Sequence, residues 1–200
     1  MKTLVIHISG PSGSGKTTMG NKLKKMFKNK INVLDLDDVF YDFQKQNNLK
    51  WGAKFAKKRY QTFINETIES KLKRKKILIV VGLNQDMDHH SGYYKIPADY
   101  KFYIKIPVDV VVRRKFDRAI DSCFGDAFKT IKNDLFQDLL RDEKGTIENM
   151  LQNFQMNFLL SKIKKDTEKW NRDYKEMDYQ FVEPTKLLKK VTNLIKEFST

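Results

Sequence analysis

Short apolar runs separated by stretches with helical spacing of apolar residues define the pattern of this chain. The runs predict five strands, at residues 4–9, 31–36, 77–81, 101–106 and 179–182. The third run, ILIVV, has no polar alternation, which is typical of a strand buried on both faces of a parallel sheet. Helical spacing predicts helices at residues 17–28, 48–73, 110 to about 124 and 186–198, and a mainly helical stretch at 127–177 that breaks near Gly145.

Strands that alternate with helices predict an α/β fold with one doubly wound parallel five-stranded sheet and a helical insertion between the fourth and fifth strands. The chain has 200 residues, 40% of them hydrophobic, which suits a single domain over residues 1–200. We expect residues 119–177 to form a helical lid or insertion of that domain. No apolar stretch approaches the roughly 20 residues that span a bilayer, so we expect no membrane partner.

Composition indicates a cellular compartment and leaves two explanations for the net charge. The apolar run at residues 4–8 is too short for a signal peptide, and the single cysteine, Cys123, has no partner for an intrachain disulfide. Both features favour a cytoplasmic protein. The net charge of +14 either neutralises nucleic-acid phosphates or reflects a lysine-rich composition, since only seven of the 39 basic residues are arginine. We favour the second interpretation.

Residues 10–17, GPSGSGKT, match the phosphate-binding loop G-x-x-x-x-G-K-T, also called Walker A, between a predicted strand and a predicted helix. Backbone N–H groups in such a glycine-rich turn converge on phosphate oxygens, and the helix N-terminus adds positive potential. The motif predicts that Lys16 reaches the β and γ phosphates, that Thr17 ligates Mg²⁺ and that Thr18 contacts the α phosphate. The candidate nucleotide-binding residues are Gly10, Ser12, Gly13, Ser14, Gly15, Lys16, Thr17 and Thr18. The alternative, a chance glycine-rich turn, fits the two flanks poorly.

Two classes of phosphate-loop protein fit less well than a kinase. A GTPase needs N-K-x-D, which is absent, and the D-x-x-G at residues 142–145 lies in the late helical region. A motor ATPase usually ends its third strand with an acid, whereas residues 80–84 read VVGLN.

The second strand ends in closely spaced acids, Asp35, Asp37 and Asp38. Alternation along a strand turns Asp35 and Asp37 to one face, and we expect this strand end to lie adjacent to the loop at the carboxyl edge of the sheet. One carboxylate could then orient hydrated Mg²⁺ while the other accepts a proton from an attacking hydroxyl. Alternatively, the acids end the strand and cap the next helix, an interpretation that fits Asp38 best.

The loop GPSGSGKTT, the strand end LDLDD and the arginines of VVRRKFDRAI together resemble the small P-loop kinases. Shikimate and gluconate kinases carry a similar D-x-D, uridine kinases an acid followed by aromatic residues, and polynucleotide 5′-kinases a paired acid. The resemblance covers residues 1 to about 120 and 179–198. It implies transfer of the γ-phosphoryl of ATP, with Asp37 as general base or acceptor anchor and Asp35 on the Mg²⁺ side. The uridine-kinase alignment places the base at Asp38 instead.

In the resembling families, arginines after the fourth strand close over the phosphates, a role that falls here on Arg114 and Arg118. The alternative for these arginines and Arg113 is pairing with Asp117 or Asp121 on the same helix. By analogy alone, residues 183–185 hold adenine. His89 and His90 stand beside two acids, but we do not favour a metal site there. The aromatic residues after the acidic strand end could stack on a base or pack in the core, namely Phe40, Tyr41, Phe43 and Trp51.

The sequence thus predicts an ATP- and Mg²⁺-dependent phosphotransferase acting on a small acceptor, most simply a nucleoside or nucleotide. One alternative is a polynucleotide 5′-hydroxyl kinase, which would give the basic surface a purpose. Another is a regulatory nucleotide-binding ATPase. The sequence specifies neither the acceptor nor the oligomeric state.

Overall fold

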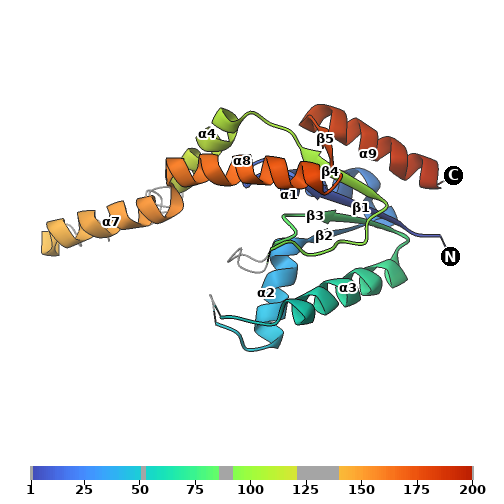
Figure 1. Cartoon of the computed structure of the whole chain (residues 1–200), viewed down its shortest axis with the longest axis horizontal. Coiled ribbons are helices and arrows are strands. Elements are labelled where there is room, and N and C mark those ends of the chain that lie inside the picture. The colour runs from blue at the N-terminus through green and yellow to red at the C-terminus, as the bar shows by residue number, and fades with distance from the viewer. Residues whose placement is uncertain (1, 51–52, 86–91, 121–139, 200) are drawn as a thin grey trace. The chain divides into compact units, whose positions relative to one another are not determined.

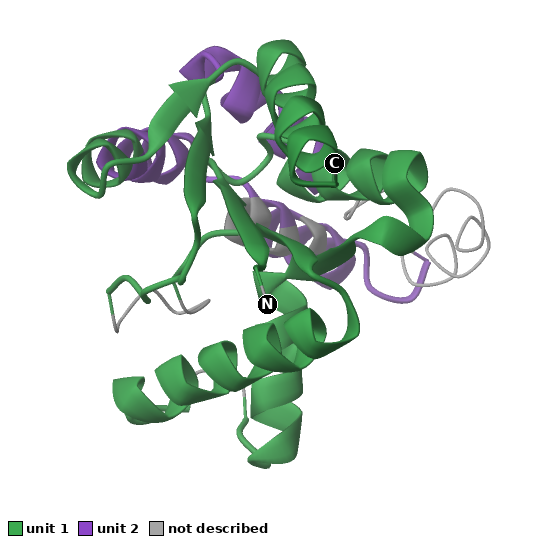
Figure 2. Ribbon diagram, turned by 90° about the vertical axis from the view of Figure 1, so that its right-hand side faces the viewer, with its two compact units in different colours: residues 1–105, 171–200 green, residues 106–170 purple. Residues whose placement is uncertain are grey.

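The structure is a computed structural model, and it describes residues 2–50, 53–85, 92–120 and 140–199. The chain forms two compact units, one of Met1–Lys105 with Asn171–Thr200 and one of Ile106–Trp170 (Figure 2). The first unit holds the sheet and the phosphate loop. The second is helical in its described part.

A five-stranded parallel sheet forms the centre of the first unit, in the order β2-β3-β1-β4-β5. Ile6 in the central strand pairs with Ile79 on one side and Tyr100 on the other. This sheet confirms the predicted fold class. The strands are β1 (Leu4–Ser9), β2 (Asn32–Asp35), β3 (Ile77–Val81), β4 (Tyr100–Ile104) and β5 (Gln180–Val182).

Helices cover both faces of this sheet, as expected for a doubly wound fold (Figure 1). On one face α1 packs so closely that a Cβ at Gly20 would lie 3.0 Å from Val33 and 3.1 Å from Val81. On the other face Leu34, Leu78 and Val80 pack against α2 and α3 in an apolar core. The helices of the first unit are α1 (Lys16–Phe27), the short η1 (Lys28–Lys30), α2 (Leu36–Gln46), α3 (Lys57–Arg74) and α9 (Pro184–Ser199).

The helix α2 differs from the prediction, which extended the second strand through residue 36 and placed a single helix at 48–73. The strand ends at Asp35, and the helix begins at Leu36 without an intervening turn. Its buried side chains recur at helical spacing and face the core, at Leu36, Val39, Phe40, Phe43 and Gln44. Acids in its first turn suit the positive end of the helix dipole.

The second unit confirms the predicted helical insertion between β4 and β5. Its described helices are α4 (Val108–Ile120), α7 (Glu143–Asn157) and the start of α8 (Leu160–Glu176). The rings of Phe116, Phe154 and Phe158 pack together, with centroids 5.4–6.0 Å apart. Asp142 interrupts the helical course near the expected break and caps α7 by accepting from the Gly145 N–H at 2.9 Å, which gives the D-x-x-G a capping role. Among the described residues, no helix has the length and apolar character of a membrane span.

Candidate active site

The phosphate loop joins β1 to α1 at the carboxyl edge of the sheet. Gly15 caps α1 with φ 93°, a left-handed conformation that glycine adopts without a Cβ penalty. A Cβ at Gly10 would lie 2.7 Å from Ser14 Oγ and 3.0 Å from Ile104 Cβ. The loop therefore requires glycine at position 15 for its backbone conformation and at position 10 for close packing on β4.

The described groups of this loop suit a bound phosphate. A Cβ at Gly15 would meet no described atom within 4 Å, so open space lies in front of the turn. Ser14 Oγ is buried and has no hydrogen-bond partner among the described residues. No described side chain caps the first turn of α1, and that turn contains no acid. Phosphate oxygens would accept from the Ser14 hydroxyl and from the backbone N–H groups at the start of α1, and their negative charge would suit the positive end of the helix.

The Lys16 side chain folds back over the loop. Its ammonium donates to the carbonyl oxygens of Gly10 at 2.9 Å and Pro11 at 3.0 Å. A phosphate oxygen is the stronger acceptor because both partners then carry charge. The ammonium therefore lies within the loop and needs only a side-chain rotation to meet phosphate.

Thr17 and Asp35, the two predicted Mg²⁺-side residues, lie together. Thr17 Oγ1 donates to Asp35 Oδ2 at 2.8 Å across 18 residues of sequence. We expected the strand of Asp35 to lie next to β1. This expectation is wrong, because β3 lies between the two strands. The contact arises instead because α1 crosses above β3 and β2, where Gly20 packs on Val81 and Val33.

A hydroxyl and one carboxylate are a typical protein share of a Mg²⁺ site, whose other ligands are phosphate and water oxygens. No cluster of three or more His, Cys, Asp or Glu suited to a metal occurs among the described residues. Thr17 and Asp35 would hold the ion when nucleotide is bound.

Asp37 and Asp38 are placed by a helix rather than by the strand. The expected alternation of Asp35 and Asp37 on one strand face is wrong, because Asp35 is the N-cap of α2. Asp35 Oδ1 accepts from the Asp37 N–H at 3.1 Å, which keeps the two residues at one corner of the site. Asp37 and Asp38 are both exposed in the first turn. The choice between them as the base stays a prediction.

A buried polar network that the sequence did not predict supports the end of β3. His7 Nε2 lies 3.1 Å from the Gly82 carbonyl and Nδ1 lies 2.6 Å from the Tyr179 hydroxyl. The carbonyl can only accept, so the neutral ring donates from Nε2 and accepts at Nδ1. Asn84 Nδ2 donates to the Tyr94 carbonyl at 2.6 Å, and its Oδ1 accepts from the Tyr174 hydroxyl. A histidine inside an apolar strand run was the available sequence signal.

Burial lowers the pKa of His7 to about 3 from its ordinary value of 6.5. The unfolded chain takes up this proton below about pH 6.5 and the folded chain does not, so acidification favours unfolding from there down to about pH 3. We expect the free energy of unfolding to fall by about 1 kcal/mol between about pH 6 and 5 through this one group. Urea unfolding at both pH values measures it. His7→Gln is the control, and an equal fall in that variant would contradict the assignment.

The arginines belong to the second unit, so their predicted approach to the phosphates stays a prediction. Arg113 Nε donates to Asp117 at 3.0 Å, with both side chains largely exposed, so for Arg113 the pairing alternative holds. Arg114 and Arg118 lie on the same helix, α4.

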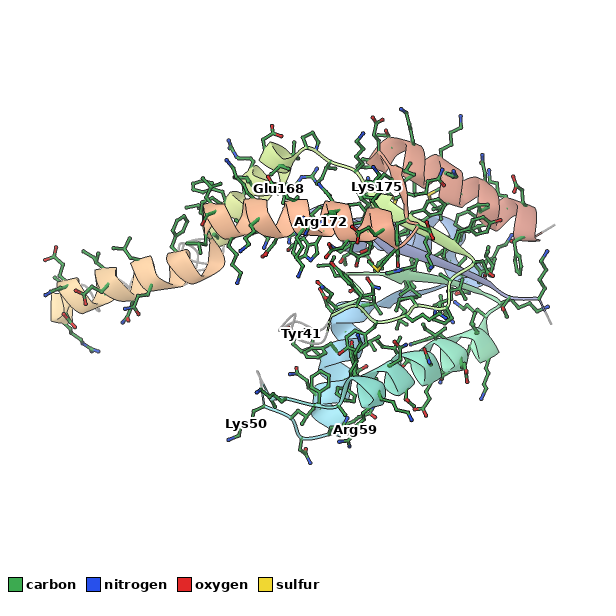
Figure 3. The ribbon with its side chains drawn as sticks, viewed as in Figure 1. Tyr41, Lys50, Arg59, Glu168, Arg172 and Lys175 are labelled. Atoms are coloured by element: carbon green, nitrogen blue, oxygen red, sulfur yellow. The ribbon has the colours of Figure 1, made fainter. Side chains whose placement is uncertain are left out.

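Two of the three described aromatic residues near the acids belong to the core. Phe40 and Phe43 are 1% exposed, which excludes them as stacking surfaces, whereas Tyr41 is 51% exposed on α2 (Figure 3). Trp51, like His89, His90 and Cys123, lies outside the described residues.

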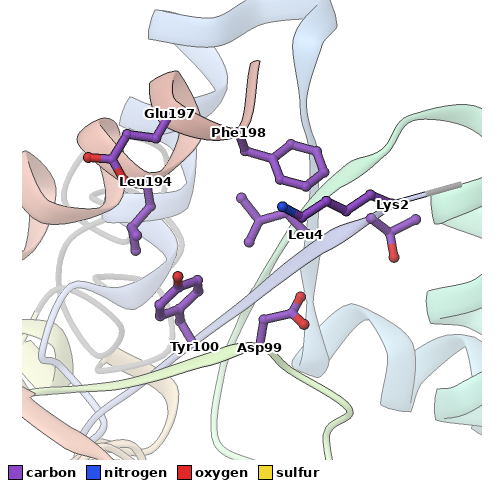
Figure 4. A pocket seen from close by; sticks show the side chains of 8 residues that line it. Lys2, Leu4, Asp99, Tyr100, Leu194, Glu197 and Phe198 are labelled. Carbon is purple, nitrogen blue, oxygen red and sulfur yellow. The ribbon is translucent and has the colours of Figure 1, made fainter. Parts of the chain in front are cut away.

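Two further features of the first unit are Glu183 and a hollow at the opposite edge of the sheet. Glu183 precedes α9 and accepts from Lys186 at 3.0 Å, and its predicted place near adenine stays a prediction. A hollow of about 270 Å³ opens near the amino ends of β1 and β4, beside Leu4 and Asp99 (Figure 4). It lies at the edge of the sheet opposite to the phosphate loop, so it is no part of this site.

Comparison with known proteins supports the fold. No family model and no curated protein matches the chain. A tRNA isopentenylpyrophosphate transferase from Bacillus halodurans is similar in structure, with a TM-score of 0.54 and 13% identity over 98% of this chain and 96% of that chain. A shikimate kinase from Aquifex aeolicus has a TM-score of 0.48 and 18% identity over 98% of both chains. Together with the sheet order and the loop, the likeness to the Bacillus halodurans transferase shows that the chain has the P-loop kinase-like α/β fold.

Proposed function

We propose that this protein is an ATP- and Mg²⁺-dependent phosphotransferase that moves the γ-phosphoryl of ATP to a small acceptor of the nucleoside or nucleotide class. The observation that carries the proposal is the 2.8 Å hydrogen bond from Thr17 to Asp35. It joins the phosphate loop to the acidic corner that begins α2. Nucleotide binding and acceptor activation therefore have their residues at one place.

The division of labour follows from the chemistry of each side chain. Backbone N–H groups of the loop and the Lys16 ammonium hold the β and γ phosphates. Mg²⁺, when bound, supplies positive charge to the phosphate oxygens. Asp37 accepts the acceptor's hydroxyl proton as the acceptor oxygen bonds to the γ phosphorus. The bond from that phosphorus to the β–γ bridging oxygen breaks, and ADP leaves with the electron pair.

An acceptor screen tests this proposal. We expect label from γ-labelled ATP to appear on a nucleoside or nucleotide only when Mg²⁺ is present. Asp35→Asn should raise the Mg²⁺ concentration needed, because one oxygen ligand then loses its charge. The panel should include sugars and 5′-hydroxyl oligonucleotides. Steady ATP hydrolysis that no acceptor stimulates, and that Asp37→Ala leaves unchanged, would contradict phosphotransfer and favour a regulatory ATPase.

A further inference from the structure

A segment of the first unit carries positive charge without any negative charge. Between Asp42 and Glu66 the sequence contains no acid and six cationic residues, which we call the basic segment: Lys45, Lys50, Lys54, Lys57, Lys58 and Arg59. All six are exposed, and none forms an ion pair with a described residue. Lys50 and Arg59 both lie at the end of α2 and α3 that is remote from the sheet strands (Figure 3).

Lysine-rich composition does not explain where these charges lie. Three of them, Lys57, Lys58 and Arg59, occupy the first turn of α3, where the helix dipole disfavours cations. That turn has no acid, and no described side chain caps it. At the carboxyl ends of α1 and α3, by contrast, cations suit the negative end of the helix dipole. These cations are Lys24 and Lys25 in α1 and Lys71, Lys73 and Arg74 in α3. An anionic partner would offset the unfavourable placement.

One residue of the basic segment, Lys57, is connected to the carboxyl edge of the sheet, where the phosphate loop lies. Lys57 Nζ is 5.7 Å from the centroid of the Tyr94 ring. The Tyr94 carbonyl in turn accepts from Asn84, which closely follows the end of β3. Lys57 therefore connects the start of α3 to the chain that follows β3 at this edge.

One face of α2 leads from the catalytic corner toward the basic segment. Asp37, Tyr41 and Lys45 are four residues apart, so they share a face and follow one another at a rise of about 6 Å. Reading outward, a carboxylate is followed by a half-exposed aromatic ring and then by a cation. Asp38 and Asp42 lie on the neighbouring stripe, so negative charge borders this face on one side.

We propose that this face of α2 and the basic segment bind the end of a single-stranded nucleic acid. Tyr41 stacks on a base, and the cations pair with successive phosphates, the combination by which proteins hold single strands. Six cations spread over residues 45–59 exceed what one nucleotide's phosphate requires. The binding surface stands on its own residues. Its role as the acceptor site rests on the proposed phosphotransfer, with the terminal nucleoside of the strand in the place of the small acceptor and its hydroxyl as the acceptor group.

The test is binding of a short fluorescent single-stranded oligonucleotide without ATP, followed by anisotropy between about 50 and 200 mM salt. The triple variant Lys54→Gln, Lys58→Gln, Arg59→Gln removes three cations of the segment. The matched control Lys22→Gln, Lys24→Gln, Lys25→Gln removes three exposed cations of α1. We expect the first variant to lose about tenfold or more in affinity and its log–log salt slope to shrink by about 2, roughly 0.7 for each lost phosphate contact. The control should bind as the wild type does.

Tyr41→Ala tests the stacking. It should weaken binding of a base-bearing strand about tenfold and leave an abasic strand unaffected. Equal weakening by both triple variants, absence of wild-type binding, or equally good competition by mononucleotides would overturn the proposal. Binding to anionic lipid vesicles in place of the oligonucleotide would overturn it too.

The two proposals fail separately. Oligonucleotide binding without any phosphoryl transfer would count against the proposed function alone. Transfer to free nucleosides without oligonucleotide binding would count against this surface alone.

Discussion

Replacing Lys16 with alanine is expected to lower phosphoryl transfer by about 10²–10³-fold, the loss typical of a single charged or hydrogen-bonding group aimed at the reacting oxygens. The ammonium already lies within the loop, held by the carbonyls of Gly10 and Pro11 at 2.9 and 3.0 Å. Removing it takes away the one side-chain cation of the loop sequence, residues 10–17, while the backbone donors stay. Initial rates of label transfer, together with ATP binding by calorimetry, measure the effect.

Lys24→Ala is the matched control for that experiment. Lys24 is an exposed lysine of the same helix, in its last turn, so the variant removes equal charge without touching the loop. We expect wild-type rates from it. Unchanged transfer by the Lys16 variant would show that the loop does not hold the transferred phosphate, and the proposed function would fail.

Local signals explain why part of this site could be predicted from sequence. The phosphate loop is eight consecutive residues between a buried strand and a helix, and its geometry depends on few distant groups. The bounds of β1 and β3 were predicted correctly because both are short, mainly apolar runs that are buried along their whole length and followed directly by glycine. The helix α2 was missed because Leu34 and Leu36, both buried, also fit the alternation of a strand.

The parts of the site that could not be predicted from sequence depend on contacts between residues far apart in the chain. The hydrogen bond between His7 and Tyr179 joins residues 172 positions apart, and no local pattern reports it. The contact of Thr17 with Asp35 was expected for an incorrect reason, since the strands concerned are separated by β3. The path of α1 across the sheet, and not strand adjacency, brings the hydroxyl to the carboxylate.

Substitution of Asp37 should distinguish its role from those of Asp35 and Asp38. We expect Asp37→Asn to lower the turnover number by about 10²–10⁴-fold, because an amide cannot accept the acceptor's proton. ATP affinity should stay near the wild-type value, since Asp37 makes its contact with Asp35 through the backbone N–H, which the substitution preserves. Single-turnover transfer at saturating ATP measures the chemical step directly.

Asp38→Asn is the matched control, because Asp38 is the next residue of the same first turn and is also exposed. It should leave the turnover number within about threefold of the wild type, as expected for a surface charge that does not touch the reacting atoms. If Asp38→Asn instead shows the large loss while Asp37→Asn does not, the base is Asp38, as the resemblance to uridine kinases implies. If neither variant loses activity, the acidic corner at the start of α2 activates no acceptor, and the chemistry assigned to it is wrong.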